Sequence, residues 1–329
     1  MTAISVIGAG AWGTTIANIL AGNGHDVTLW CYKESLAKSI HTEAKHHRLP
    51  GVKLDPNIKT TTHFDDCYAS DFVVLGFSSK QLIEYEHQLV WQKMTKIALI
   101  AKGVIEPNLF ISDWIASRFS GEVALISGPN LALEIAQKKP AATVVASTHH
   151  EFAQQIQKCL SNSYFRVYTS TDLRGVECGG IFKNIFAIAA GCLDALDYGQ
   201  NAKAALITRG LLELERLFAF FGASRSTLMG LSGLGDLIAT CSSSQSRNWQ
   251  LGYEVIQNPN RNEWEKSNRG ETEGVRTIRL IHSKIIEESL DLPIILSIGR
   301  LFFEHDVSPK KIIQDLMERG LKSEFDQLI

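Results

Sequence analysis

The first half of the chain alternates between short apolar runs rich in β-branched residues and segments with helical periodicity. Runs of this kind are typical of strands that are buried on both faces. Seven strands are predicted in this way, at residues 4–7, 27–30, 72–75, 97–100, 123–126, 143–146 and 165–168. Because helical segments separate several of them, we expect a mainly parallel sheet with helices on both faces.

The pattern changes beyond about residue 175, where helical periodicity continues and no convincing strand follows. Five helices are predicted there, near residues 177–196, 201–221, 274–288, 293–304 and 308–319. Pro293 and the Ser308-Pro309 pair occupy cap and first-turn positions of the last two. The fold class expected is α/β, with an α/β domain over residues 1–175 and an all-helical domain over residues 176–329.

Composition and charge indicate a small-molecule partner. The 329 residues suffice for two domains, and 45% hydrophobic with 21% charged residues is ordinary for a globular protein. A formal charge of -2 leaves no excess of Lys and Arg to neutralise the phosphates of a nucleic acid. A nucleic-acid partner is therefore not expected.

Cysteine usage and the N-terminus favour a cytoplasmic location. The six cysteines form no CxxC pair, so we interpret them as reduced thiols and expect no metal site. His46 and His47 are adjacent, which suits a polar loop better than a pair of metal ligands. The N-terminus lacks the charged region and cleavage site of a signal peptide. No uninterrupted apolar run reaches the roughly 18 residues that cross a bilayer, so no integral membrane segment is expected.

A dinucleotide-binding motif follows the first predicted strand. Gly8, Gly10 and Gly13 form G-x-G-x-x-G directly after that strand and open a helix. Gly8 permits the tight turn, Gly10 lets the backbone approach a pyrophosphate, and Gly13 allows close packing of helix and strand. The alternative is a glycine-rich turn without a ligand. The context favours a Rossmann-like NAD(P)-binding domain.

The residues after the second strand bear on which nicotinamide cofactor binds. In Rossmann domains an acidic residue there holds the ribose hydroxyls and repels a 2′-phosphate. Here the tip carries Tyr32 and Lys33, while Glu34 is expected past the tip, at the start of the next helix. This pattern leans towards NADPH and leaves NADH open. Alternatively, Lys33 and Glu34 are only solvated charges at a helix start.

Two further turns are expected at the ligand crevice of the sheet. Lys102 follows the strand at residues 97–100, and Gly128 and Asn130 follow the strand at residues 123–126. Ligands in open α/β sheets bind beyond the carboxyl ends of the strands. Both turns therefore point to the crevice, although a lysine at the end of a strand can also be merely solvated.

The helical half contains a cluster suited to a phosphate monoester. Three glycines within six residues precede Asp236, which suggests a tight turn that delivers a carboxylate into a helix start. Ser246, Arg247 and Asn248 are expected at another helix N-terminus, where the Arg fork and free N–H groups suit a phosphate. Taken singly, each is more often a cap or a surface charge.

Lys183 stands beside Asn184 in GGIFKNIFAIAAG, a segment of otherwise apolar or small residues. Polar residues on a surface helix recur about every turn, and this pair has no such companions. The isolation predicts that the pair is buried. The alternative is a lysine whose long side chain reaches the surface from a packed helix.

Taken together, the motifs resemble those of the NAD(P)-dependent glycerol-3-phosphate dehydrogenase family of the bacterial type. The resemblance covers nearly the whole chain. The matching motifs are, in order, GAGAWGT, HRLPGVKLDPNI, AKG, SGPNLALE, GGIFKNIFAIAAG, NAKAALITRG, GLSGLGDLIATC, SRN and DLMER. It implies reversible NAD(P)H-dependent reduction of dihydroxyacetone phosphate to sn-glycerol 3-phosphate for phospholipid synthesis, in a possible homodimer.

The resemblance also implies roles for individual residues. Lys183 is expected to be the proton acceptor in oxidation, its pKa lowered by burial and by a second cation such as Lys102. Asp236 is expected to orient Lys183 or a substrate hydroxyl. The positions expected at the cofactor are Gly8, Gly10, Ala11, Trp12, Gly13, Tyr32, Lys102, Ala132, Arg247, Glu271 and Glu273. Those expected at the substrate are Lys102, Gly128, Asn130, Lys183, Asp236, Ser246, Arg247 and Asn248.

Three positions depart from the family pattern. Asn130 stands where a hydroxyl residue is more usual, and Ala11 replaces a frequent serine. Glu271 stands where an apolar residue is common, which puts its contact in doubt. Two other functions stay open: a related dehydrogenase acting on another hydroxy or keto acid, and a redox-sensing module that binds NADPH without chemistry.

Overall fold

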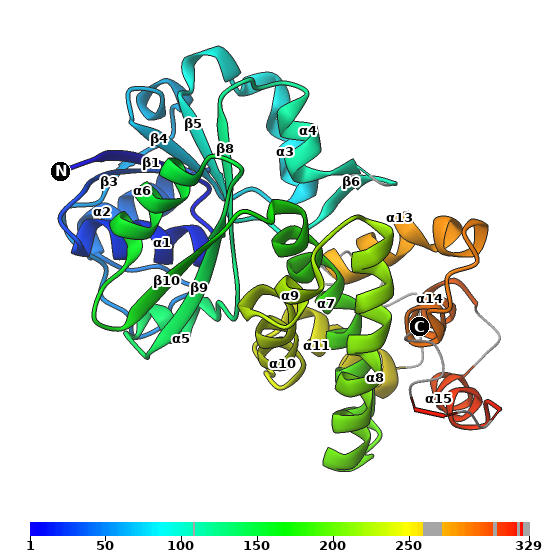
Figure 1. The fold of residues 1–329 in the computed structure, drawn as a ribbon. Coiled ribbons are helices and arrows are strands. Elements are labelled where there is room, and N and C mark those ends of the chain that lie inside the picture. Colours follow the sequence, from blue (N-terminus) through cyan, green and yellow to red (C-terminus); the bar gives the residue numbers. More distant parts are fainter. Residues whose placement is uncertain (108, 259–271, 305–307, 321–322, 325–329) are drawn as a thin grey trace.

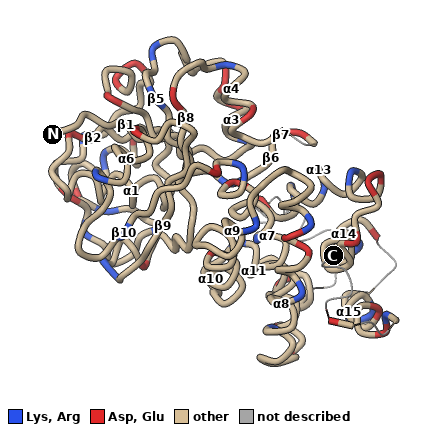
Figure 2. Tube along the Cα trace, viewed as in Figure 1, with Lys and Arg blue, Asp and Glu red and all other residues tan. Residues whose placement is uncertain are grey.

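The computed structural model describes residues 1–107, 109–258, 272–304, 308–320 and 323–324. It consists of a sheet with flanking helices followed by a helical part, which lie side by side in Figure 1. Lys and Arg are interspersed with Asp and Glu over both parts (Figure 2), in keeping with the formal charge of -2. The α/β fold class predicted from the pattern is confirmed.

The main sheet has eight strands in the order β10-β9-β8-β5-β4-β1-β2-β3. The strands are β1 (Ala3–Ile7), β2 (Asp26–Trp30), β3 (Lys59–Thr61), β4 (Phe72–Leu75), β5 (Lys96–Leu99), β8 (Glu122–Ser127), β9 (Ala141–Ala146) and β10 (Phe165–Ser170). All seven predicted strands are confirmed. The edge strand β3 was not predicted, because its sequence KTT carries no apolar signal.

The sheet is parallel except at one pairing. Strand β9 runs antiparallel to β8, and β10 pairs parallel with β9, so the last two strands are reversed relative to the other six. Apolar runs do not encode strand direction, because both faces of the sheet are buried in either case. A separate hairpin of β6 (Val104–Glu106) and β7 (Leu109–Phe110) projects towards the helical part (Figure 1).

Helices cover both faces of the sheet and form two apolar cores. The helices of this half are α1 (Ala11–Gly22), α2 (Glu34–Glu43), α3 (Ser79–Tyr85), α4 (Ile111–Ala116), α5 (Ala132–Ala136) and α6 (His150–Leu160), with short turns η1 (Phe64–Cys67), η2 (Glu86–Gln88) and η3 (Trp91–Lys93). In β4, Phe72 and Val74 enter the core under α1 and α6, whereas Val73 and Leu75 enter the core under α3 and α4. This alternation explains the continuous apolar run, because side chains on both faces are buried.

The helical part is built around one buried helix. Its elements are α7 (Leu173–Ala195), α8 (Gly199–Phe220), α9 (Arg225–Leu228), η4 (Leu231–Gly235), α10 (Asp236–Cys241), α11 (Arg247–Gln257), α13 (Glu273–Glu287), α14 (Pro293–Phe303) and α15 (Pro309–Met317). The predicted helix starts at Pro293 and at Ser308-Pro309 are confirmed, with Ser308 capping α15. Every residue from Gly175 to Leu193 in α7 is buried.

Helix α7 is a buried core helix, although its length and apolar composition would also suit a membrane span. This suitability, judged by length and composition alone, differs from the expectation that no apolar run of the chain is long enough to cross a membrane. Its apolar window is, however, 100% buried inside the fold. Close backbone packing explains the small residues: a methyl group at Gly191 would lie 2.0 Å from the Trp249 carbonyl oxygen, and one at Gly252 would lie 2.0 Å from that of Ile188.

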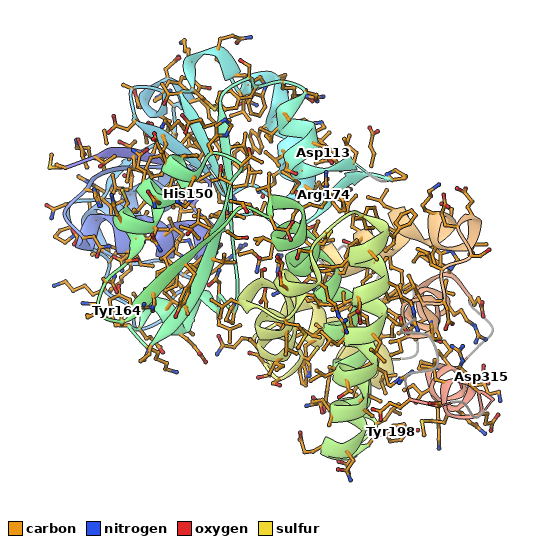
Figure 3. All side chains as sticks on the ribbon, in the orientation of Figure 1. Asp113, His150, Tyr164, Arg174, Tyr198 and Asp315 are labelled. Carbon is orange, nitrogen blue, oxygen red and sulfur yellow. The ribbon has the colours of Figure 1, made fainter. Side chains whose placement is uncertain are left out.

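Polar contacts join the hairpin and α4 to the helical part. Arg174 of α7 forms an ion pair with Asp113 of α4 at 2.6 Å (Figure 3). The buried Glu177 carboxylate accepts hydrogen bonds from the Ser112 backbone N–H and hydroxyl. Arg276 of α13 donates to the Ile105 carbonyl at 3.0 Å. These bonds hold α4 against α7 and the hairpin against α13.

A buried glutamate caps the start of α14. The Glu213 side chain accepts hydrogen bonds from the backbone N–H groups of Ile294 (2.7 Å) and Ile295 (3.0 Å). Those groups have no partner within the helix, because they belong to its first turn. Burial raises the pKa of Glu213 to about 7, an effect that these two hydrogen bonds oppose. The carboxylate thus ties α8 to α14.

We expect Glu213→Gln to destabilise the fold by about 1–3 kcal/mol, because one of the two acceptor oxygens becomes an N–H that faces a backbone donor. Urea unfolding followed by circular dichroism measures this. Glu215→Gln, which removes an ion pair to the exposed Arg225, is the matched control and should cost less than about 1 kcal/mol. Equal losses in the two variants would contradict the capping role.

Candidate active site

The glycine motif forms a tight turn between β1 and α1. Gly8 has φ +123°, and a methyl group there would lie 3.0 Å from the Gly76 carbonyl carbon. A methyl group at Gly13 would lie 2.1 Å from the Gly8 carbonyl oxygen, so helix and turn are in direct contact. Gly10 is the N-cap of α1, and a methyl group there would meet no atom within 4 Å. The helix start carries no acidic residue, so this turn fits the pyrophosphate of a dinucleotide.

His46 contacts the same turn. Its side chain is 3% exposed, and its Nε2 lies 3.0 Å from the Ala9 carbonyl oxygen. The backbone N–H of Arg48 donates to its Nδ1 at 3.0 Å. Burial lowers the pKa of His46. Both histidines lie in a loop, as predicted, but His46 is buried and only His47 is exposed.

The residues after β2 flank this turn. Tyr32 is 49% exposed, and the Lys33 Nζ lies 5.2 Å from the centre of the Tyr32 ring. Glu34 is exposed and begins α2, as predicted. The tip of β2 therefore carries no carboxylate.

Three other positions expected at the cofactor lie around the start of α1. The hydroxyl of Thr15 donates to the carbonyl oxygens of Ala11 (2.8 Å) and Ala132 (3.2 Å), which joins α1 to α5. The Trp12 ring packs edge-on against Phe165, with ring centres 6.3 Å apart. Its buried Nε1 has no partner among the described residues.

The strongest feature of the site is a buried carboxylate between two lysines. Asp236 Oδ2 lies 2.6 Å from Lys102 Nζ, and Asp236 Oδ1 accepts a hydrogen bond from Lys183 Nζ. The exposed fractions of the Asp236, Lys183 and Lys102 side chains are 2%, 8% and 18%. Lys183 also donates to Thr240 Oγ1 at 2.6 Å. A side chain reaching the surface is thereby excluded for Lys183, and its predicted burial is confirmed.

The surroundings of Lys183 bring its pKa close to neutral pH. Burial lowers the pKa of Lys183 from 10.5 to about 7, because it disfavours the ammonium form. The Asp236 charge opposes this shift, and the Lys102 charge reinforces it. An amine with such a pKa can donate and accept a proton near neutral pH.

Local structure delivers Asp236 to this position. The glycine-rich turn η4 folds back so closely that a methyl group at Gly233 would lie 2.0 Å from the Leu228 carbonyl oxygen. Asp236 then begins α10, and Thr240 one turn later donates to its carbonyl oxygen at 2.6 Å. The predicted turn that delivers a carboxylate into a helix start is confirmed. Thr240 was missed, although its spacing of four residues from Asp236 in a helix was a usable signal.

The turn after β8 approaches Lys102. Lys102 Nζ donates to the Gly128 carbonyl oxygen at 3.3 Å. Asn130 Nδ2 donates to Thr143 Oγ1 at 3.0 Å, whereas the buried Asn130 Oδ1 has no partner among the described residues. The structure thus brings Lys102, Gly128, Lys183 and Asp236 together and leaves one Asn130 oxygen available nearby.

The SRN motif lies at the start of α11, as predicted. Ser246 is the N-cap, and its hydroxyl accepts from the Trp249 N–H at 3.3 Å. Asn248 donates to Asn184 Oδ1 at 3.0 Å and accepts from the Gly274 N–H at 3.0 Å. Both side chains therefore have structural partners. This network also explains why an asparagine follows Lys183.

Arg247 and Glu273 lie near each other. Arg247 is exposed at the first position of α11. Burial raises the pKa of Glu273, and the positive charges of Arg247 and Arg276 oppose the shift. Glu273 accepts from the Ser79 hydroxyl at 3.1 Å, which links α13 to α3. The prediction for Glu271 lies outside the described residues.

Comparisons with known proteins agree with this geometry. Residues 3–153 match the family described as NAD-dependent glycerol-3-phosphate dehydrogenase N-terminus, and residues 172–314 match its C-terminus. This chain belongs to the glycerol-3-phosphate dehydrogenase family. It is 37% identical over 339 residues to the glycerol-3-phosphate dehydrogenase [NAD(P)+] of Oceanobacillus iheyensis, with 100% of this chain and 97% of the relative covered.

Two further members are similar over nearly their whole length. The glycerol-3-phosphate dehydrogenase [NAD(P)+] of Staphylococcus epidermidis is 38% identical, with 98% of this chain and 100% of the relative covered. The crystal structure of the Coxiella burnetii glycerol-3-phosphate dehydrogenase superposes with a TM-score of 0.87 at 32% identity, covering 97% and 99% of the two chains. The resemblance and the NAD(P)-dependent oxidoreductase class expected from the motifs are confirmed.

We expect Gly180→Ala to lower turnover of dihydroxyacetone phosphate by about tenfold or more, because small displacements of reacting groups cost large factors. A methyl group there would lie 2.8 Å from Ser127 Oγ, which must shift, and 3.2 Å from Lys102 Cδ, which must move by a few tenths of an ångström. Steady-state kinetics measure this, with Gly22→Ala, which meets open space, as the control. Unchanged turnover would show that the path of the Lys102 side chain is unimportant.

Proposed function

We propose that this protein reversibly reduces dihydroxyacetone phosphate to sn-glycerol 3-phosphate with NADPH or NADH, and that Lys183 is the general acid and base. The observation that supports this most directly is the buried Lys183 amine beside a carboxylate that Lys102 shares. Membership of the family and the burial of the site are consistent with it.

The glycine turn and the start of α1 would hold the dinucleotide. Gly8 and Gly13 allow the tight turn, Gly10 leaves open space for the pyrophosphate, and the helix N-terminus favours its negative charge. When bound, the nicotinamide supplies or takes the hydride at C2 of the substrate. In this proposal Ala11, Trp12, Tyr32, Ala132 and Glu273 line the cofactor site, as does Glu271 outside the described residues.

Lys183 would move the proton that accompanies the hydride. In reduction, its ammonium group donates a proton to the ketone oxygen as C2 gains the hydride, which leaves the C2 hydroxyl and a neutral amine. In oxidation, the neutral amine takes the hydroxyl proton. The pKa near 7 suits both directions, because neither form is strongly disfavoured at neutral pH.

Lys102 and Asp236 would prepare the site for developing negative charge. The Lys102 ammonium is positioned to stabilise the ketone oxygen, and its effect is larger where water is sparse. Asp236 holds both cations in place and limits their mutual repulsion. Catalytic roles for Lys183, Lys102 and Asp236 follow from this arrangement.

Substrate phosphate would bind at the start of α11. Arg247 presents an exposed guanidinium there, and the helix N-terminus adds a favourable field for an anion. Gly128, with the free Asn130 oxygen, would face the glycerol part of the substrate. Ser246 and Asn248 would contribute mainly by holding α11, because their side chains already have partners.

We propose different roles for the two halves of the chain. Residues 1–175 would bind the cofactor, and residues 176–329 would provide most of the substrate site. We also predict that the protein is cytoplasmic, that it forms a homodimer and that it supplies glycerol 3-phosphate for phospholipids.

A dehydrogenase for another keto acid is less favoured, since Arg247 suits a phosphate. A redox sensor that only binds NADPH is also less favoured, because it would not need two lysines, Lys183 and Lys102, paired with the Asp236 carboxylate.

The substrate assignment is tested by initial rates of NADPH and NADH oxidation, at equal concentration, with dihydroxyacetone phosphate and with a panel of 2-keto acids. We expect turnover with the phosphate ester alone. Lys183→Met, which keeps length and packing, should lower turnover about 100-fold or more. Its affinity for NADPH, measured by fluorescence titration, should stay within about twofold. Near-normal turnover in this variant would refute the proton-transfer role.

The rate of ketone reduction should fall as the pH rises through about 7, because only the protonated Lys183 donates. The rate of glycerol 3-phosphate oxidation should rise over the same interval, because only the neutral amine accepts. Initial rates in both directions between about pH 5.5 and 9 measure these profiles. Parallel profiles in the two directions would contradict the assignment of Lys183.

A further inference from the structure

Lys102 lies in a short connection between the main sheet and the β6–β7 hairpin. Ile100 is still bonded to the sheet, because its N–H donates to the Leu75 carbonyl oxygen at 3.1 Å. Strand β6 begins two residues after Lys102, at Val104. The backbone positions of Ile100 and Val104, on either side of Lys102, therefore decide where its side chain starts.

Helix α13 holds the second of these two positions. Arg276 Nε donates to the Val104 carbonyl oxygen at 3.4 Å, and Arg276 Nη2 donates to the Ile105 carbonyl oxygen at 3.0 Å. Val104 and Ile105 are 1% and 3% exposed, so their carbonyl groups need partners within the fold. The guanidinium is planar and carries donors in fixed directions, which suits two successive carbonyl groups.

Glu273, three residues earlier on α13, lies against the same stretch of backbone. A methyl group at Gly103 would lie 2.5 Å from Glu273 Oε2 and 3.0 Å from Ser79 Oγ. Residues three apart lie on one face of a helix. One face of α13 therefore contacts residues 103–105, directly after Lys102.

The Lys102 side chain depends on this backbone for its place in the site. Its Nζ lies 2.6 Å from Asp236 Oδ2 and 3.3 Å from the Gly128 carbonyl oxygen. A lysine stem is flexible, so these contacts require a fixed starting point. The side chain is 18% exposed, so an ammonium group that is released from Asp236 has a route to water.

We propose that Arg276 is a positioning residue for the reaction, because its two hydrogen bonds fix the backbone from which Lys102 reaches Asp236. The proposal rests on the proposed function, in which Lys102 is catalytic. Arg276 is bonded to backbone carbonyl groups, so it acts through Lys102 and needs no contact with substrate or cofactor. Residues 104 and 276 are separated by 172 positions, so this contact couples the sheet half to the helical half.

Arg276→Ala tests the proposal in the full-length protein. We expect kcat for reduction of dihydroxyacetone phosphate to fall about tenfold, because a displacement of about 1 Å can cost a factor of this size. The Kd of NADPH, measured by fluorescence titration, should stay within about twofold. A loss of NADPH affinity as large as the loss of kcat would instead assign Arg276 to the cofactor site and overturn the proposal.

The matched control is Arg279→Ala, which removes an exposed arginine three residues further along α13. This variant should keep kcat within about twofold of the unmodified protein. Equal kcat values in Arg279→Ala and Arg276→Ala would overturn the proposal.

The pH profile separates the positioning of Lys102 from general support of the fold. The charged groups that face Lys183 are Asp236 and Lys102. The nearby Cys241 thiol is neutral, because burial raises its pKa to about 12. The Lys102 charge lowers the pKa of Lys183, so withdrawing that charge raises it.

In Arg276→Ala, the pH at which the reduction rate falls to half should therefore move upward by about half a pH unit or more. Initial rates between about pH 5.5 and 9 measure this profile. A variant that is less stable in urea but keeps the profile of the unmodified protein would contradict the positioning role.

Arg276→Lys keeps the positive charge but reaches only one of the two carbonyl groups at a time. We expect its kcat to lie about threefold below that of the unmodified protein, and so above that of Arg276→Ala. No recovery relative to Arg276→Ala would contradict the proposal. If Arg276→Ala does not fold, Arg276→Lys is compared with the unmodified protein, and equal kcat values and pH profiles would then overturn the proposal.

A crystal structure of Arg276→Ala, or of Arg276→Lys in its place, gives a measurement that does not depend on turnover. We expect Lys102 Nζ to lie more than about 3.5 Å from both Asp236 carboxylate oxygens, beyond hydrogen-bond distance. A Lys102–Asp236 pair that is kept in the variant would overturn the proposal. If the variant loses the pair and the unmodified protein fails to reduce dihydroxyacetone phosphate, only the proposed function is refuted.

Discussion

The site depends on one carboxylate that is held away from water between two ammonium groups. Asp236 contacts Lys102 from the sheet half and Lys183 from α7. Burying a single charge is strongly unfavourable, and a buried pair is tolerated only where geometry and further hydrogen bonds are good. Here two cations and one anion leave a net positive charge in a poorly hydrated place. Burial is the main cause of the lowered pKa of Lys183, and the Lys102 charge adds to the shift, whereas the Asp236 charge opposes it.

The same arrangement joins the two parts of the fold. Lys102 follows β5, whereas Lys183 and Asp236 belong to α7 and α10, so the shared carboxylate is a contact across the carboxyl edge of the sheet. Arg174, Glu177 and Arg276 add hydrogen bonds along this boundary. Glycines in α7 permit such close packing, since a methyl group at Gly180 would lie 2.8 Å from Ser127 Oγ and 3.2 Å from Lys102 Cδ. Packing and proton chemistry are therefore coupled in α7.

The cofactor end of the site follows a different physical rule. Around the glycine turn the buried polar side chains include Thr15 and His46, and no Asp, Glu, Lys or Arg of the described residues is buried there. The turn itself provides N–H donors and a helix dipole, which bind any pyrophosphate. This end of the site therefore relies on backbone geometry rather than on buried charged side chains.

Much of this fold and site was predictable from sequence, because the responsible signals are local. Apolar runs identified seven strands, the glycine spacing identified the dinucleotide turn, and the isolation of Lys183 predicted its burial. A turn that delivers Asp236 into a helix start was equally local. Tertiary structure alone decided the reversal of β9 and β10, because buried strands look the same in both directions.

Tertiary structure also decided which polar atoms meet. The two lysines on Asp236 are separated by 81 positions in sequence, and the Asn184–Asn248 bond spans 64 residues. The burial of His46 against Ala9 and the partners of Ser246 and Asn248 likewise follow from packing. Periodicity reports whether a residue is buried, because that depends on its own segment. It does not report the partner of a buried polar atom, because that partner is supplied by a distant segment.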